Sequence, residues 1–97
     1  MKKILIVDDE PHIRQLISKY ASYEGYDVSC AEDGAEAVEL CRFNDYDIII
    51  MDIMMPLLNG FEASREIRKL RNTPIILLSA KGEEYDRING FEAGAEL

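Results

Sequence analysis

The sequence is poor in three features that often define a protein class: paired cysteines, long apolar runs and basic residues. Its only cysteines are Cys30 and Cys41, and their separation matches no metal-binding or redox motif. We therefore expect neither a disulfide framework nor a zinc site. Both thiols are expected to be small core residues of a reduced, cytoplasmic protein.

The apolar runs are too short for a membrane protein. No stretch approaches the roughly 20 residues that a helix needs to cross a bilayer. The N-terminal MKKILIVDDE joins two lysines to an apolar run of only four residues that is followed by three acids, which does not fit a signal peptide. The sequence thus predicts no membrane partner.

Basic residues are outnumbered by acidic ones, 11 to 19, and the formal net charge of the 97-residue chain is −8. An acidic surface repels nucleic acid and anionic lipid, so we expect no direct nucleic-acid binding by this chain. The excess acid favours cations or basic partner surfaces. The length indicates one small domain over residues 1–97, with no repeat or linker.

Two hydrophobic patterns alternate along the chain. Solid apolar runs indicate strands buried on both faces, and apolar residues three or four positions apart indicate helices. This β-α alternation is typical of a parallel sheet with helices on both faces. Strands are expected at 4–7, 26–31, 48–51 and 75–78. Helices are expected at 11–24, after an N-cap at Asp33, at 61–70 and at 83–93. The inward residues are Ala37, Val38 and Cys41 in the helix after Asp33, and Ala63, Ile67 and Leu70 in the helix at 61–70.

Polar residues follow the solid apolar runs. Asp8 and Asp9 come after the first run, Asp52 ends the run IIIMD, and Ser79 follows the run that starts at Ile75. Ligands of open α/β sheets bind at the carboxyl ends of the strands. Because neighbouring strands are about 4.8 Å apart, we expect the three carboxylates to lie within several ångströms of one another.

Such a cluster suits a hard divalent cation, Mg²⁺ or Mn²⁺, which prefers carboxylate oxygens, water and phosphate. A cation would keep Asp52 ionised, and an ionised carboxylate is a nucleophile that needs no general base. A phosphoryl group is its natural electrophile, since the metal can also neutralise phosphoryl oxygens. Ser79 could donate a hydrogen bond to the new phosphate.

Other interpretations of the same residues are open at this point. Each acid alone could be a helix N-cap. A phosphatase with an aspartyl nucleophile would need D-x-D, but Met54 occupies the second acidic position. A nucleotide or flavin domain would need a first loop rich in Gly, Ser or Thr, which VDDEPH is not. Gly60 is expected to adopt a positive φ in a turn.

The motifs ILIVDDE, IIIMDIMMPLLNG and IILLSAKGEEYDRINGFEAGA resemble the receiver domain of two-component response regulators, in that family's order and over the whole chain. The resemblance implies a flavodoxin-like (CheY-like) three-layer fold and transfer of a phosphoryl group to Asp52 from a sensor histidine kinase. It further implies that Mg²⁺ binds Asp9, Asp52 and the backbone carbonyl of Met54, with Asp8 acting through water. Ser79 would bind the phosphoryl oxygen. The SAKGEEYDR segment looks most like the winged-helix OmpR/PhoB-like transcription regulators.

The sequence departs from that family at its C-terminal end. The family continues into a fifth strand, a lysine and a fifth helix, whereas this sequence stops at GAEL. Lys81 is close to Ser79 in sequence, but a solvated loop lysine is the favoured interpretation. We therefore expect a sheet of order 2-1-3-4 and self-association through an open fourth strand or the first-helix face. An alternative function is a structural fragment with an idle site.

Overall fold

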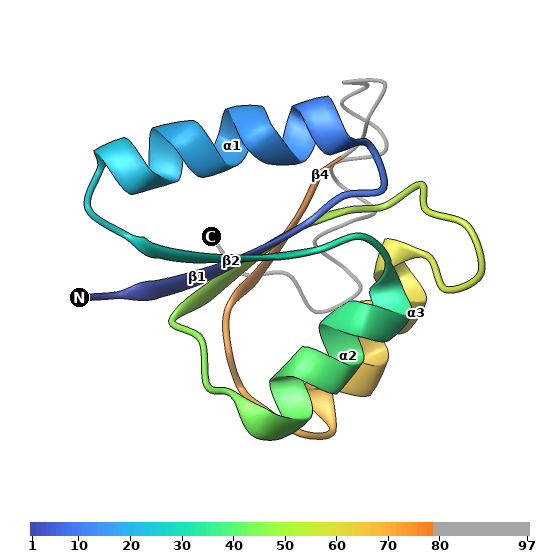
Figure 1. Ribbon diagram of the computed structural model, residues 1–97. Coiled ribbons are helices and arrows are strands. Elements are labelled where there is room, and N and C mark those ends of the chain that lie inside the picture. The colour runs from blue at the N-terminus through green and yellow to red at the C-terminus, as the bar shows by residue number, and fades with distance from the viewer. Residues whose placement is uncertain (79–97) are drawn as a thin grey trace.

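The computed structural model describes residues 1–78, which form a parallel β-sheet with helices on both faces (Figure 1). The strand order is β2-β1-β3-β4, as predicted. The helix expected at 83–93 lies outside the described residues. In chain order the elements are β1 (Lys3–Val7), α1 (Pro11–Tyr23), β2 (Asp27–Ala31), α2 (Gly34–Phe43), β3 (Ile48–Asp52), α3 (Gly60–Arg68) and β4 (Ile75–Leu78).

The two inner strands, β1 and β3, form the centre of the sheet. Their register pairs Ile4 with Ile48 and Val7 with Met51, so both strands end at the same level. Helix α1 covers one face of the sheet, and α2 and α3 lie side by side on the other face (Figure 1). The larger apolar cluster is on the α2/α3 face and includes Leu5, Ile49 and Met51. Burial on both faces explains the solid apolar runs of these strands.

The α1 face of the sheet is covered less completely. Within residues 1–78, α1 is the only helix on this face, and it packs over β1 and β2. Side chains alternate across a sheet, so Ile48 and Ile50 of β3 point to this face together with Ile76 and Leu78 of β4. The three isoleucines are only partly buried, and Leu78 is 38% exposed.

The helix starts follow local sequence signals. Asp33 caps α2 as predicted, because its carboxylate accepts a hydrogen bond from the Glu36 N–H at 2.7 Å. Asn59 and Glu62 form a reciprocal capping box at α3. Helix α1 starts at Pro11 without a side-chain cap, which is consistent with proline's preference for the first helical turn.

Two sequence predictions about burial need correction. Helix α3 ends at Arg68, so Leu70 lies beyond it and is 39% exposed instead of inward. Cys41 is buried, but Cys30 is exposed on β2, which is an edge strand of the sheet. Helix α1 packs the small residue Ala21 into the core and leaves Leu16 and Tyr20 exposed. None of the helices within residues 1–78 is long and apolar enough to cross a membrane.

Candidate functional site

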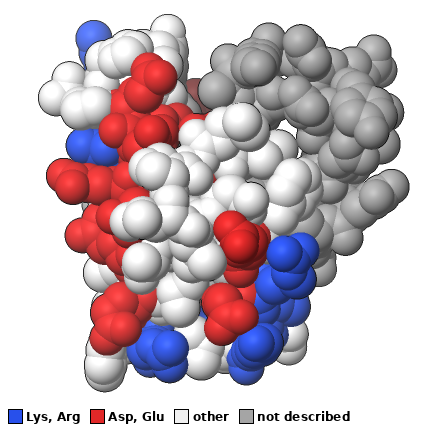
Figure 2. All heavy atoms as spheres, turned by 90° about the vertical axis from the view of Figure 1, so that its right-hand side faces the viewer, with Lys and Arg blue, Asp and Glu red and all other residues white. Residues whose placement is uncertain are grey.

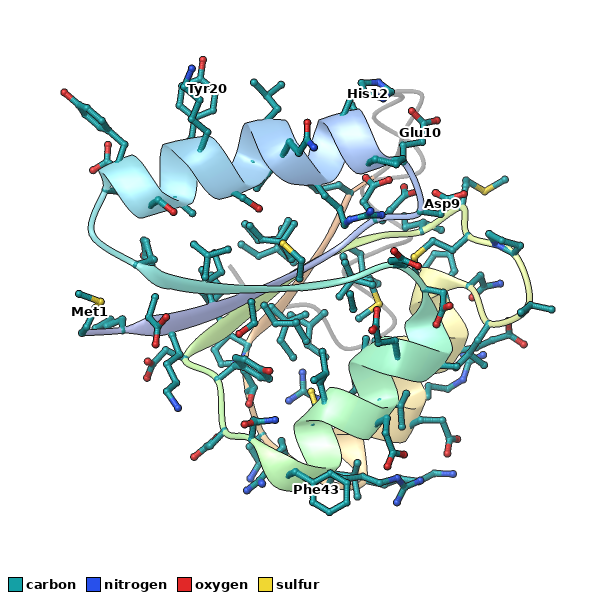
Figure 3. The ribbon with its side chains drawn as sticks, in the orientation of Figure 1. Met1, Asp9, Glu10, His12, Tyr20 and Phe43 are labelled. Atoms are coloured by element: carbon teal, nitrogen blue, oxygen red, sulfur yellow. The ribbon has the colours of Figure 1, made fainter. Side chains whose placement is uncertain are left out.

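Three aspartates meet at the carboxyl ends of the inner strands. Asp8 and Asp9 directly follow β1, and Asp52 is the last residue of the neighbouring β3. One carboxylate oxygen from each lies within 4.8 Å of the others. Figure 3 shows Asp9 at this end of the sheet, with Glu10 above it at the start of α1. The predicted convergence of these three acids is therefore confirmed.

The acids differ in their access to solvent. Asp52 is 5% exposed and Asp8 is 8% exposed, whereas Asp9 is exposed. The pKa of Asp52 is raised to about 6, first by burial and then by the nearby negative charges of Asp8 and Asp9. Burial also raises the pKa of Asp8, with the Asp9 charge as a smaller contribution. Both pKa values rise because burial and the neighbouring negative charges disfavour the ionised form of each carboxylate.

Backbone donors partly offset this cost. The N–H groups of Met54 and Ile53 donate hydrogen bonds to the Asp52 carboxylate and lower its pKa. The Glu10 N–H donates to Asp8 Oδ1 at 2.9 Å. The β1–α1 and β3–α3 loops thus hold the carboxylates in place through main-chain contacts.

Arg14 is a site neighbour that the sequence alone did not reveal. Its Nη1 donates to the backbone carbonyl of Asp8 at 2.7 Å, and its Nη2 lies 3.8 Å from Glu32 Oε1. The side chain is only 15% exposed, and its charge lowers the pKa of Asp8. An arginine one turn into an amphipathic helix carries no sequence signal that distinguishes it from a solvated residue.

Gly60 determines how closely α3 approaches the end of β3. A Cβ atom at this position would lie 2.5 Å from the Asp52 carbonyl oxygen and 2.8 Å from Ile53 Cα. The Gly60 N–H also donates to the Ile53 carbonyl at 2.9 Å. Our prediction of a positive φ at Gly60 was wrong, since Gly25 is the only glycine within residues 1–78 with that conformation. Gly60 is required for space and not for its φ.

The predicted participant Ser79 falls outside the described part of the chain, as does Lys81, for which a solvated loop position was the favoured interpretation. Met54 is described: its N–H faces Asp52, and its side chain is 61% exposed. The proposed role of its carbonyl as a metal ligand stays a prediction. The single histidine, His12, is exposed beside Glu10, with 3.4 Å between Nε2 and Oε2, and is not part of the cluster.

The three aspartates fit a hard divalent cation. They offer oxygen ligands only, within the short separation that one ion can bridge. A positive ion would also remove the mutual repulsion that raises the pKa of Asp52. The arrangement can therefore bind a cation and present a carboxylate oxygen beside it.

A parallel sheet in the order β2-β1-β3-β4, with an acidic cluster at the ends of its inner strands, defines a flavodoxin-like α/β domain. Within this class the chain belongs to the response regulator receiver domain family, whose model matches residues 4–97. Receiver domains are phosphoacceptor signalling domains that bind Mg²⁺ in an acidic site and interact with sensor histidine kinases.

Curated relatives include transcriptional regulatory proteins. ResD of Bacillus subtilis is 49% identical over 94 residues, which are 97% of this chain and 39% of ResD. SrrA of Staphylococcus aureus is 45% identical over the same shares. The chain thus spans 39% of the length of each of these two relatives.

Solved receiver domains share the fold. That of the Francisella response regulator 1452 superposes with a TM-score of 0.88 at 38% identity, over 99% of this chain and 80% of that one. The receiver domain of sensor histidine kinase PA1611 from Pseudomonas aeruginosa also gives a TM-score of 0.88 at 38% identity, over 98% of this chain and 80% of that one. The PA1611 structure has a magnesium ion coordinated in its active site cleft.

Proposed function

We propose that this chain accepts a phosphoryl group on Asp52 from the phosphohistidine of a sensor histidine kinase, in a reaction that requires Mg²⁺ or Mn²⁺. The observation that carries the proposal is the cluster of Asp8, Asp9 and Asp52 oxygens within 4.8 Å of one another. A buried carboxylate at the end of a rigid strand is a positioned nucleophile, and two further acids beside it can share a cation with it.

In the proposed reaction an Asp52 carboxylate oxygen attacks the phosphorus atom, and the P–N bond to the donor histidine breaks. The electron pair of that bond stays on the imidazole nitrogen, and Asp52 becomes an acyl phosphate. Asp9, Asp52 and the Met54 carbonyl would hold the cation directly, and Asp8 would hold it through water. The cation supplies charge neutralisation for the phosphoryl oxygens. Ser79 would donate a hydrogen bond to one of those oxygens.

The site favours phosphoacceptance over enzymatic turnover. A phosphatase with an aspartyl nucleophile places a second acid two residues further on, where this chain has Met54. The product is therefore a modified protein and not a released metabolite. We further propose that the chain is the receiver part of a cytoplasmic transcription regulator, because the curated relatives ResD and SrrA are transcriptional regulatory proteins.

Intact mass spectrometry tests the proposal directly. The chain is incubated with Mg²⁺ and acetyl phosphate, a small phosphodonor, and then weighed. We expect one phosphoryl adduct in the wild type and in the control variant Asp45→Asn, whose residue is exposed and outside the cluster. The adduct should be absent in Asp52→Asn and after Mg²⁺ is removed with EDTA. If the wild type forms no adduct, the proposal is wrong and the structural-fragment alternative is favoured.

A further inference from the structure

The loop between β3 and α3, which begins directly after Asp52, presents two apolar side chains to solvent. Met54 is 61% exposed and Leu57 is 93% exposed. Their neighbours Ile53 and Met55 are buried at 5% and 7% exposure, so the loop does have apolar side chains that serve the core. Met54 and Leu57 form a pair that the packing of the fold does not account for.

The backbone explains why these two side chains point outward. The Met55 N–H donates to the Ile53 carbonyl at 3.1 Å, and the Leu58 N–H donates to the Pro56 carbonyl at 2.8 Å. Hydrogen bonds between residues two apart define γ-turns, in which the middle residue is at the apex. Met54 and Leu57 are therefore the apex residues of two γ-turns in the same loop.

Leu57 is an unfavourable residue for its position. Its φ is +68°, and it is the only non-glycine residue within residues 1–78 with a positive φ. A γ-turn with a positive φ at its apex is rare and strained, whereas glycine adopts that conformation without a steric cost. Since its side chain is almost fully exposed, folding gains nothing from a leucine here. Strain of this kind beside a functional site is evidence for a role outside folding.

The surroundings indicate what could contact this pair. Met54 lies two residues from Asp52, and its N–H donates to the Asp52 carboxylate. The exposed acids Asp9 and Glu10 follow β1 at the same end of the sheet, and Figure 2, which faces this end, shows a band of acidic side chains next to uncharged surface. Because Asp52 is only 5% exposed, a protein that delivers a phosphoryl group must come into contact with these loops.

We infer that Met54 and Leu57 are a docking contact for the phosphodonor protein, an inference that rests on the proposed function. The matching face of that partner combines an apolar patch, which buries the two side chains, with basic residues opposite Asp9 and Glu10. A small phosphodonor does not need this contact. The loop therefore distinguishes a protein donor from a chemical one.

Phosphotransfer from two donors tests the inference. Wild type, Leu57→Asn and Leu57→Gly are compared with Phe43→Gln, which alters an apolar side chain of 77% exposure that lies far from Asp9 (Figure 3). One donor is acetyl phosphate, and the other is an autophosphorylated sensor histidine kinase chosen beforehand because it phosphorylates the wild-type chain. Burial of one leucine corresponds to about tenfold in the apparent second-order rate constant, so we expect that loss with the kinase for both Leu57 variants.

The same variants should keep their acetyl phosphate rates within about twofold of wild type, and Phe43→Gln should keep both rates. The urea midpoint of Leu57→Gly should be no lower than that of wild type, because glycine fits the γ-turn apex. Unchanged kinase rates in both Leu57 variants would overturn the docking contact and leave phosphoacceptance intact. The docking contact would also be overturned if the Leu57 variants lost equal rate with both donors. It would be overturned as well if their sedimentation differed from that of the wild type, because Leu57 would then contact a second copy of the chain. A wild type without any acetyl phosphate adduct would overturn the proposed function as well.

Discussion

Asp52 is buried next to two other acids. The free-energy cost of ionising it in the folded state makes the stability of the protein depend on pH. The pKa of Asp52 is raised to about 6 in the folded protein, from 3.8 for an ordinary aspartate. Below pH 3.8 Asp52 is protonated in both states and imposes no such cost. Stability is lost as the pH rises from about 4 through 6, because the folded state resists ionisation more than the unfolded state does.

Replacing Asp52 with asparagine removes this ionisation and keeps the size of the side chain. In EDTA, Asp52→Asn should raise the free energy of unfolding by about 2–3 kcal/mol at pH 8 and change it little at pH 4. Urea unfolding at the two pH values measures both effects, with Asp45→Asn as the exposed control. An equal gain at pH 4 and pH 8 would contradict the electrostatic explanation.

Mg²⁺ should stabilise the wild type by binding only the folded state. The rise in melting temperature should be larger at pH 8 than at pH 5, because protons compete for Asp52 below its pKa of about 6. Asp9→Asn and Asp52→Asn should lose most of the response. Differential scanning fluorimetry with a Mg²⁺ titration measures this rise in melting temperature. If both variants respond as strongly as the wild type, the ion binds elsewhere.

At the scale of elements, the start of α3 lies in close contact with the end of β3, where Asp52 is located. The α3 capping box orients the helix, and Gly60 lets it approach the Asp52 backbone. The N–H groups of Ile53 and Met54 reach the Asp52 carboxylate from the same loop. A shift of α3 would therefore move the N–H donors that hold the Asp52 carboxylate.

Gly60→Ala tests this contact. Alanine is the better helix former, so propensity alone predicts stabilisation by up to about 1 kcal/mol. We expect a loss of about 2–3 kcal/mol instead, because the added methyl group would overlap the Asp52 carbonyl. Urea unfolding and calorimetric Mg²⁺ titration measure the two consequences, stability and weakened metal binding.

Gly25→Ala is the matched control for that experiment. Gly25 has nothing within 4 Å of its Cβ position but a φ of +95°, so alanine there should cost about 1 kcal/mol through strain alone. It lies in the turn after α1, away from the acids, and should not change Mg²⁺ affinity. If Gly60→Ala behaves like Gly25→Ala in both measurements, the close approach is unimportant.

At the scale of the whole molecule, the helices within residues 1–78 cover the two faces of the sheet unequally. Ile50 and Ile76 are partly buried and Leu78 is 38% exposed on the α1 face, although all three belong to strands. Within residues 1–78, β4 pairs with β3 on one side and with no strand on the other. Apolar strand edges and partly covered sheet faces favour association.

We therefore expect the 97-residue chain to self-associate through β4 and the adjoining α1 face of the sheet. Sedimentation velocity should show a weight-average mass that rises with concentration. Leu78→Lys should shift the equilibrium toward monomer, because a charge on the edge strand opposes pairing. Leu70→Lys is a control of nearly equal exposure, 39%, outside the sheet. A wild-type chain that stays monomeric at all concentrations would contradict this prediction.

Much of the fold could be predicted from the sequence alone. The solid runs around Ile6 and Ile50 indicate strands buried in a parallel sheet, and strand-end acids such as Asp52 must then gather at one edge. The Asp33 cap was equally local. The family motifs added the order of the strands. Predictions failed where burial depended on a neighbour, as for Cys30 on an edge strand and Leu70 beyond the end of α3.

The sequence by itself therefore determined the class of fold, the position of the proposed nucleophile Asp52 and the identity of the two acids that lie beside it. These follow from hydrophobic periodicity and from parallel strands ending together, which are properties of the chain order. Only the tertiary structure decided the close approach at Gly60, the partial burial of Arg14 with its hydrogen bond to the Asp8 carbonyl, and the strained, exposed apex at Leu57. Each of these features depends on the distance between segments that are far apart in the sequence or on a single backbone angle. Hydrophobic patterns and motifs along the chain predict neither quantity.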